Sequence, residues 1–112
     1  MKKIDAIIRP HRLEEVVNRL RLIGVQGMTV AEVHGVSRST EVMGVFRGER
    51  YRMPSAPRLQ VTIVARDDLA PSVVAGILQA ARTDEAGDGI VSIGDVVDVI
   101  RIRTGESGPE VL

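Results

Sequence analysis

The sequence predicts an α+β domain built from two successive strand–helix–strand halves. Two observations support this prediction. The spacing of apolar residues alternates between a period of two and a period near 3.6, and glycine and proline stand where the period changes. The chain has 112 residues, of which 44% are hydrophobic, so we expect one domain over residues 1–112. A domain of this size has a small core, and self-association would help to stabilise it.

The first half begins with a strand over residues 2–8, where apolar and polar side chains alternate until Pro10. From 11 to 23 the apolar residues recur at helical spacing, which predicts an amphipathic helix. Gly24 follows at the position where a glycine commonly ends a helix. A second strand is predicted over residues 28–36.

The second half begins with a strand over residues 59–64, which again alternates. A second helix is predicted to open near Pro71, which suits a first helical turn because its missing N–H costs little there. After a turn-rich segment, a fourth strand is predicted over 90–100, extended by 101–103. The tail over 104–112 is expected to be flexible.

This element order is that of the split βαβ, or ferredoxin-like, arrangement. Its sheet has two helices on one face and leaves the other face open. We expect aliphatic residues on the open face, and we expect self-association to bury them.

Composition excludes several classes of protein. The formal net charge is zero, which argues against a general nucleic-acid binder. The chain has no cysteine, and its two histidines, His11 and His34, lie in different segments, so no metal site is expected. No apolar run approaches the ~20 residues that cross a bilayer, and the first residues do not resemble a signal peptide. We therefore expect a cytoplasmic protein without membrane insertion.

The segment from about 37 to 57 shows no sustained period, which is unusual for a compact domain. It holds Phe46 and Tyr51, the only two aromatic residues of the chain, together with Arg47 and other arginines. Exposed aromatic and arginine side chains are frequent contacts of protein interfaces. The segment is therefore interpreted as a partner-binding loop, and the alternative is an insertion whose apolar residues fold back on the domain.

Three features suggest an anion site. Gly87-Asp88-Gly89 forms a short loop whose backbone N–H groups could hold phosphate oxygens. Arg101 and Arg103 lie two apart on the predicted strand, so both would point to one face and could bind an oligophosphate. Arg38, at the start of the long segment, could close on the same anion. Each feature also has a simpler interpretation, as a plain turn or as a solvated strand face.

Several segments together resemble the PII nitrogen regulatory protein family along nearly the whole chain. They are 1–10, 27–35, Arg47-Gly48 with Tyr51, Thr83 with 87–89, and 99–106. The resemblance implies a homotrimer of ferredoxin-like subunits that bind ATP or ADP in clefts between subunits. It also implies a mobile T-loop over about 37–57, which binds a target such as a transporter or regulatory enzyme, and a nucleotide-binding B-loop over about 82–90.

The resemblance implies a role for each matching position. The near side of the nucleotide cleft would comprise Met28, Thr29, Gly35, Arg38 and Val64. The phosphate side would comprise Gly87, Asp88, Gly89, Arg101 and Arg103. Effector binding falls to Ser39 and Arg58, and partner binding or modification to Phe46, Arg47 and Tyr51, the last matching a tyrosine that some members have uridylylated.

Three positions on the effector or phosphate side depart from the family pattern. Ser39 replaces a glutamine that helps to hold magnesium between ATP and 2-oxoglutarate, and Arg58 replaces a lysine that pairs with 2-oxoglutarate. Ile90 replaces a lysine beside the phosphates, and this change should weaken ATP binding more than ADP or AMP binding. Whether magnesium binds is therefore left open.

These changes lead to two predictions for the effector. The first is a small anion, bicarbonate, sensed together with an adenine nucleotide. The alternative is nitrogen-status regulation by Mg-ATP and 2-oxoglutarate. A slow ATPase is a third interpretation, but no general base is identifiable, so we predict no catalytic residues and no enzyme.

Overall fold

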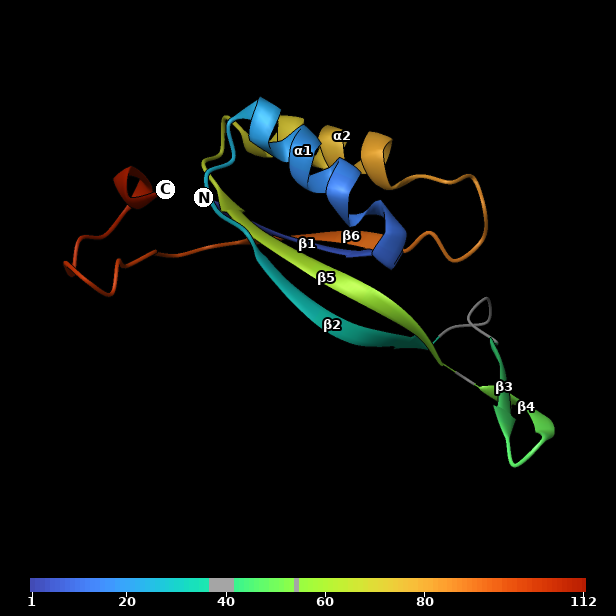
Figure 1. The fold of residues 1–112 in the computed structure, drawn as a ribbon. Helices are drawn as coiled ribbons and strands as arrows, with labels where there is room; N and C mark the ends of the chain where they lie inside the picture. Colours follow the sequence, from blue (N-terminus) through green and yellow to red (C-terminus); the bar gives the residue numbers. More distant parts are fainter. Residues whose placement is uncertain (37–41, 54) are drawn as a thin grey trace.

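The computed structural model describes residues 1–36, 42–53 and 55–112. Figure 1 shows the main sheet with helices above it and a hairpin beyond one end. In chain order the elements are β1 (Lys2–Ile8), the 3-10 helix η1 (Pro10–Arg12), α1 (Leu13–Ile23), β2 (Thr29–Val36), β3 (Val42–Phe46), β4 (Glu49–Met53), β5 (Ser55–Ala65), α2 (Ala70–Ala81), β6 (Ile90–Asp95) and the 3-10 helix η2 (Pro109–Val111).

The main sheet has four strands in the order β2-β5-β1-β6, and neighbouring strands are antiparallel. β1 lies between β5 and β6, so that Ile4 stands opposite both Ile63 and Ile93. With the hairpin set aside, the order β1-α1-β2-β5-α2-β6 confirms the predicted ferredoxin-like α+β fold.

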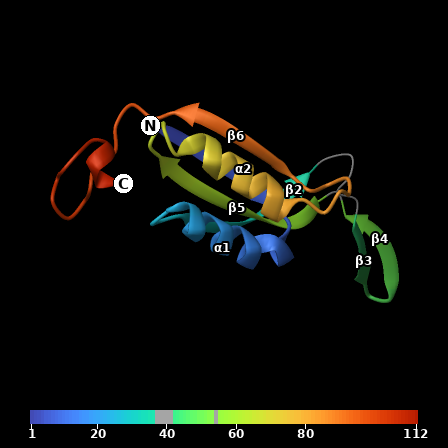
Figure 2. The ribbon, with the colours of Figure 1, turned by 90° about the horizontal axis from the view of Figure 1, so that it is seen from above.

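Both helices cover the same face of this sheet. Seen from above, α2 runs along the sheet between β5 and β6, and α1 lies beyond β5 on the side of β2 (Figure 2). Gly24 ends α1 with a φ of 112°, as the sequence predicts. The core under the helices is aliphatic, and its largest fully buried side chains are Ile4, Ile8, Val16, Leu20, Val61, Ile63, Val73 and Ile77.

The open face of the sheet is polar at its centre, so the expectation of an aliphatic open face is wrong there. Asp5 on β1 accepts hydrogen bonds from the Thr62 hydroxyl at 2.5 Å and from the Gln60 amide at 3.2 Å. These bonds lower the pKa of Asp5, and the bond from Thr62 has the largest effect. Apolar residues of this face lie toward its margin, where Ile7 pairs with Ile90.

β6 is shorter than predicted. It pairs with β1 from Ile90 to Asp95, and the Val96 N–H that follows still donates to the Met1 carbonyl at 3.0 Å. The segment after β6 instead forms a turn in which the Arg101 N–H donates to the Glu106 carbonyl at 2.8 Å, and the tail continues into η2. The predicted strand over residues 96–103 is therefore wrong, although the flexibility expected of the tail stays a prediction.

The long segment contains a β-hairpin, which the sequence pattern did not reveal. β3 and β4 pair only with each other, from Val42 opposite Met53 to Phe46 opposite Glu49. Arg47 and Gly48 form the turn with φ values of 53° and 81°, as a two-residue hairpin turn with positive φ at both positions requires. β5 already begins at Ser55, so the last part of the predicted T-loop is strand.

The hairpin lies beyond the ends of β2 and β5 (Figure 1). Arg38 and Ser39 fall outside the described residues. Among the helices of the described ranges, none is long and apolar enough to cross a membrane.

Candidate functional site

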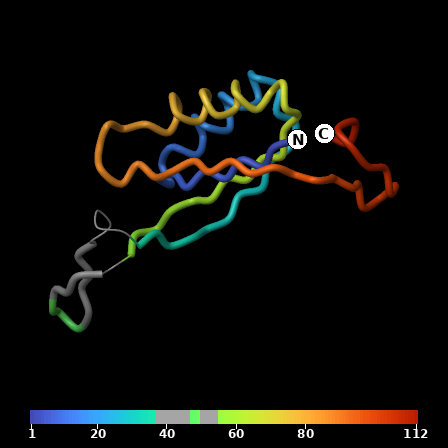
Figure 3. Tube along the Cα trace, turned by 180° about the vertical axis from the view of Figure 1, so that it is seen from behind, coloured from blue at the N-terminus to red at the C-terminus, as the bar shows by residue number. Residues whose placement is uncertain are grey.

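The residues predicted to bind ligand fall into two groups at opposite ends of the sheet. Arg58 and Val64 mark the two ends on β5, six positions apart, which is about 20 Å at the ~3.3 Å rise of a strand. On β6, the 82–89 loop precedes the strand and the tail segment follows it. Figure 3 shows this loop and the tail on opposite sides of the molecule.

The first group is built around the loop that joins α2 to β6. Gly87 and Gly89 have φ values of 94° and 104°, a region that favours glycine. At Gly89 the backbone also runs close to β1, since a Cβ there would lie 1.7 Å from the Ile7 carbonyl oxygen. The loop therefore needs glycine at this position for both conformation and space.

Asp88 turns its carboxylate back into the same loop. It accepts hydrogen bonds from the Thr83 hydroxyl and, at 2.8 Å, from the Thr83 N–H. Arg9, which follows β1, donates from Nε to the carboxylate at 3.1 Å. These bonds hold the pKa of Asp88 well below its usual range, and the bond from the Thr83 hydroxyl has the largest effect. The carboxylate is thus a fixed negative charge inside the loop.

Arg58 reaches this loop from β5. Its side chain is 8% exposed, and it donates to the Gly87 carbonyl at 3.2 Å and to the Pro57 carbonyl at 2.8 Å. A Cβ at Gly35 on β2 would lie 3.4 Å from Cγ of Arg58, which is van der Waals contact, so Gly35 lies directly against the Arg58 side chain. The structure thereby brings Gly35, Arg58 and Gly87 together. We call Arg9, Gly35, Arg58, Gly87, Asp88 and Gly89 the loop-end cluster.

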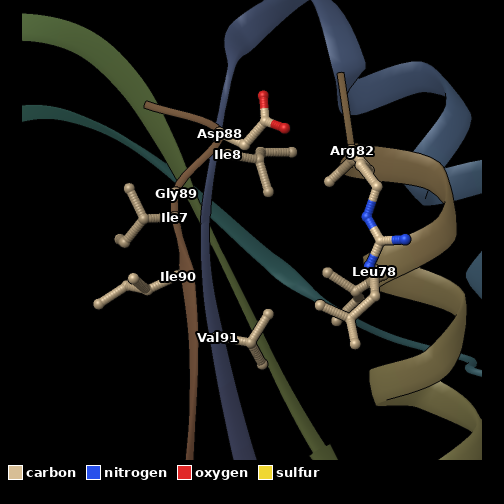
Figure 4. Close-up of a pocket in the computed structure, with 10 residues that line it drawn as sticks. Ile7, Ile8, Leu78, Arg82, Asp88, Gly89, Ile90 and Val91 are labelled. Atoms are coloured by element: carbon tan, nitrogen blue, oxygen red, sulfur yellow. The ribbon is translucent and has the colours of Figure 1, made fainter. Parts of the chain in front are cut away.

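A pocket of about 190 Å³ opens beside this cluster, between α2 and the start of β6. Figure 4 shows Leu78 and Arg82 on one side of it and Asp88 at its end. Ile8 and Val91 turn toward the helix, whereas Ile7 and Ile90 turn to the other side of the sheet. Ile90 is 69% exposed there.

The second group lies at the other end of the sheet. Met28, Thr29 and Val64 line a cavity of about 810 Å³, which Val99 and Val111 of the segment after β6 also line. Most of the residues that line it are apolar, which would suit the face of an aromatic base.

Arg101 adjoins this second cavity through the tail. Its guanidinium donates to the Glu106 carboxylate and to the Val111 carbonyl, both at 3.3 Å. Arg103 is exposed in the turn that follows. We call Met28, Thr29, Val64, Arg101 and Arg103 the tail-end cluster.

In the folded chain, the residues of the two predicted sides of the cleft are therefore divided differently between the two ends of the sheet. Arg101 and Arg103 lie at the opposite end of the sheet from Gly87–Gly89, and Gly35 lies away from Met28 and Thr29. The argument that the two arginines share one strand face is wrong, because this segment is not a strand. No single chain gathers all the predicted nucleotide contacts around one point.

The remaining predicted residues lie in or near the hairpin. Phe46 pairs with Glu49 and Tyr51 with Gly44, while Arg47 is exposed at the turn. Within the described ranges, no group of three or more histidine or acidic residues could hold a metal ion.

The family model of the nitrogen regulatory protein P-II matches residues 1–106 of this chain. The chain belongs to the P-II family. P-II proteins are signalling regulators and not enzymes, so the family confirms both the resemblance found in the sequence and the prediction of a non-enzymatic protein.

Individual P-II proteins match over almost their full length. The P-II protein of Cereibacter sphaeroides is 43% identical over 110 residues, which is 98% of each chain. P-II 2 of Methanothermobacter thermautotrophicus is 46% identical over 108 residues, covering 96% of this chain and 94% of that protein. P-II 1 of Escherichia coli is 43% identical over 106 residues, covering 95% of each.

Sequence reasoning missed Arg9 and assigned no role to the side chain of Thr83. Arg9 is 79 positions from Asp88, and nothing in the local pattern indicates their contact. The signal for Thr83 was available, since a hydroxyl residue a few positions before an aspartate in a turn-rich segment commonly hydrogen-bonds to it.

Proposed function

We propose that this chain is a nitrogen-regulatory signalling protein that assembles as a homotrimer and binds an adenine nucleotide between subunits. Its membership of the P-II family supports this proposal. The nucleotide would report the energy state, an anionic effector would report nitrogen status, and the hairpin segment would carry the signal to a target protein.

The separation of the two clusters is the observation that carries the proposal. One end of the sheet offers the apolar wall of Met28 and Val64 with two nearby arginines, and the other offers the glycine loop and Arg58. A ligand with an apolar base at one end and phosphates at the other needs both. Because the ends lie about 20 Å apart on β5, a second copy must bring its opposite end alongside.

Such a contact joins different surfaces of two copies, and head-to-tail contacts of this kind close into rings when the rotation permits. Exposed aliphatic side chains after β6, including Val97, Ile100 and Ile102, would be covered in the ring. A trimer with three nucleotide sites is the arrangement that we propose.

For the effector, the similarity to nitrogen regulatory proteins supports 2-oxoglutarate with Mg-ATP rather than bicarbonate, which the three family departures favoured. Arg58 would supply the cation for a carboxylate, after exchanging its bond to the Gly87 carbonyl for the ligand. Magnesium would be held by the nucleotide phosphates, and Ser39, its predicted protein contact, falls outside the described residues.

For the target, we propose the hairpin of β3 and β4. Its strands pair with each other and not with the main sheet, which leaves the hairpin able to reach another protein. The target would be a transporter or a regulatory enzyme, and Tyr51 on β4 would be the site of any uridylylation.

A calorimetric titration tests the nucleotide site. Wild-type protein is titrated with ATP, ADP and AMP, each with and without magnesium, 2-oxoglutarate or bicarbonate, and its mass is measured by light scattering. Arg103→Ala should weaken ADP binding by about 10-fold or more, since a charged hydrogen bond contributes about 1.5–3 kcal/mol. Arg21→Ala, an exposed arginine of the last turn of α1, is the control and should bind normally.

The titrations distinguish the two proposed effectors. Tighter Mg-ATP binding with 2-oxoglutarate supports the nitrogen regulator, whereas tighter ADP or AMP binding with bicarbonate alone replaces it by an inorganic-carbon sensor. A monomer that binds no nucleotide refutes the proposal.

A further inference from the structure

Asp88 stands in the loop predicted to hold phosphate, yet its carboxylate is already saturated. Oδ1 accepts from the Thr83 hydroxyl and from Arg9 Nε, and Oδ2 accepts from the N–H groups of Thr83, at 2.8 Å, and Asp84, at 3.0 Å. An ionised carboxylate has about four acceptor sites, so these four donors leave little capacity for a ligand.

A direct contact between the Asp88 carboxylate and the nucleotide phosphates would also be unfavourable. The carboxylate and the phosphates are both negative, and like charges at close range repel. Its side chain is only 24% exposed, which further limits access. A residue that binds phosphate by contact would instead be expected to present a cation or a donor.

Arg9 ties the same loop to the sheet. Besides its bond to Asp88, it donates from NH2 to the Ala86 carbonyl at 2.8 Å. Arg9 follows directly on Ile8, which is 1% exposed in the core, so its backbone is held by the sheet. The loop is thus held by hydrogen bonds at Thr83 and Ala86, before Gly87, and at Asp88, directly after it.

We propose that Arg9, Thr83 and Asp88 are positioning residues that fix the backbone of the 83–89 loop in the conformation that receives the nucleotide phosphates. Asp88 acts through the loop and not on the ligand. This inference rests on the proposed function for its ligand, and it reassigns Asp88 from a predicted contact to a loop-organising carboxylate.

A purely electrostatic effect of Asp88 and a positioning role predict opposite signs for one substitution. If Asp88 acted only by its charge, Asp88→Ala would remove a repulsion and tighten ADP binding. If it positions the loop, the same change weakens ADP binding, because the loop must then be ordered when the ligand binds. Glu85→Ala removes an exposed carboxylate from the same loop and is the matched control for charge.

Two substitutions of Thr83 test whether its hydroxyl is needed to hold Asp88. Thr83→Val keeps the shape but removes the hydroxyl donor to Asp88, whereas Thr83→Ser keeps the donor. Each variant is titrated with ADP in the full-length protein well below its melting temperature. Hydrogen exchange of the amides of residues 84–89 is measured without nucleotide.

We expect Asp88→Ala and Thr83→Val to weaken ADP binding about 10-fold and to speed exchange in the loop at least as much. Thr83→Ser and Glu85→Ala should bind ADP within about 2-fold of wild type. Wild-type affinity, or tighter binding, in Asp88→Ala overturns the inference, and so does weaker binding without faster exchange, which indicates direct contact.

Failure of the proposed function is separately visible. If wild-type protein binds no adenine nucleotide, the proposed function falls, and the inferred role in phosphate binding falls with it. If wild-type protein binds ADP but loop exchange is equal in wild type, Asp88→Ala and Thr83→Val, only the positioning role falls.

Discussion

Gly89→Ala tests the close approach between the 83–89 loop and β1. An added Cβ would lie 1.7 Å from the Ile7 carbonyl oxygen and 2.8 Å from its carbonyl carbon, both backbone atoms of a central strand. Gly89 also has a φ of 104°, where a side chain is strained by about 1–3 kcal/mol. Since β1 is paired on both sides, the loop must move rather than the strand.

The expected loss of stability follows from these two terms. Backbone strain together with at least one weakened loop hydrogen bond of about 1 kcal/mol gives a loss of 2 kcal/mol or more. An unfolding entropy of about 2.1 cal/mol/K per residue amounts to about 0.24 kcal/mol/K for 112 residues, so the melting temperature should fall by about 8 °C or more.

The assay is thermal unfolding followed by circular dichroism, with all proteins at the same concentration and without nucleotide. Gly94→Ala on the same strand is the control, because no atom lies within 4 Å of its added Cβ and its φ is not positive. Its melting temperature should change by less than about 2 °C. A Gly89→Ala protein that melts with wild type and binds ADP normally would refute the close approach.

Three further predictions concern other parts of the chain. Arg12→Met removes two donors to the Ala80 carbonyl at the end of α2, at 2.9 and 2.6 Å, and should cost about 1–2 kcal/mol in urea unfolding; an unchanged midpoint contradicts this. Thr62→Val should raise the pKa of Asp5, measured by NMR titration. In the native state the pKa of Asp5 is lowered, so the ionised carboxylate stabilises the fold at pH values above the unfolded pKa of about 3.9. This stabilisation is lost as the pH falls through the native pKa. The variant should therefore be less stable than wild type at neutral pH and equally stable in acid. Deleting residues 40–53 should leave the melting temperature nearly unchanged, since the hairpin forms a separate sheet, and should abolish capture of the target; a deletion that unfolds the protein shows that the segment packs on the domain.

The elements that depend on local pattern could be predicted from the sequence alone. The strand over 2–8 was predicted with its observed bounds, and the helix ending at Gly24 was predicted to the residue at its C-terminal end. The side-chain period of the strand and the glycine cap of the helix each depend only on residues that are neighbours along the chain. The glycine loop at 87–89 was found for the same reason, because its conformation needs glycine wherever the loop lies.

The features that depend on distant partners are visible only in the folded chain. β6 is a strand where it pairs with β1, from Ile90 to Asp95, and this extent depends on a segment some ninety residues earlier in the sequence. Arg58 meets Gly87 across 29 positions, and Arg9 meets Asp88 across 79. Local pattern carries the conformation that a residue prefers but not which distant group its side chain will reach, so the loop-end cluster and the direction of the Asp88 carboxylate became visible only in the folded chain.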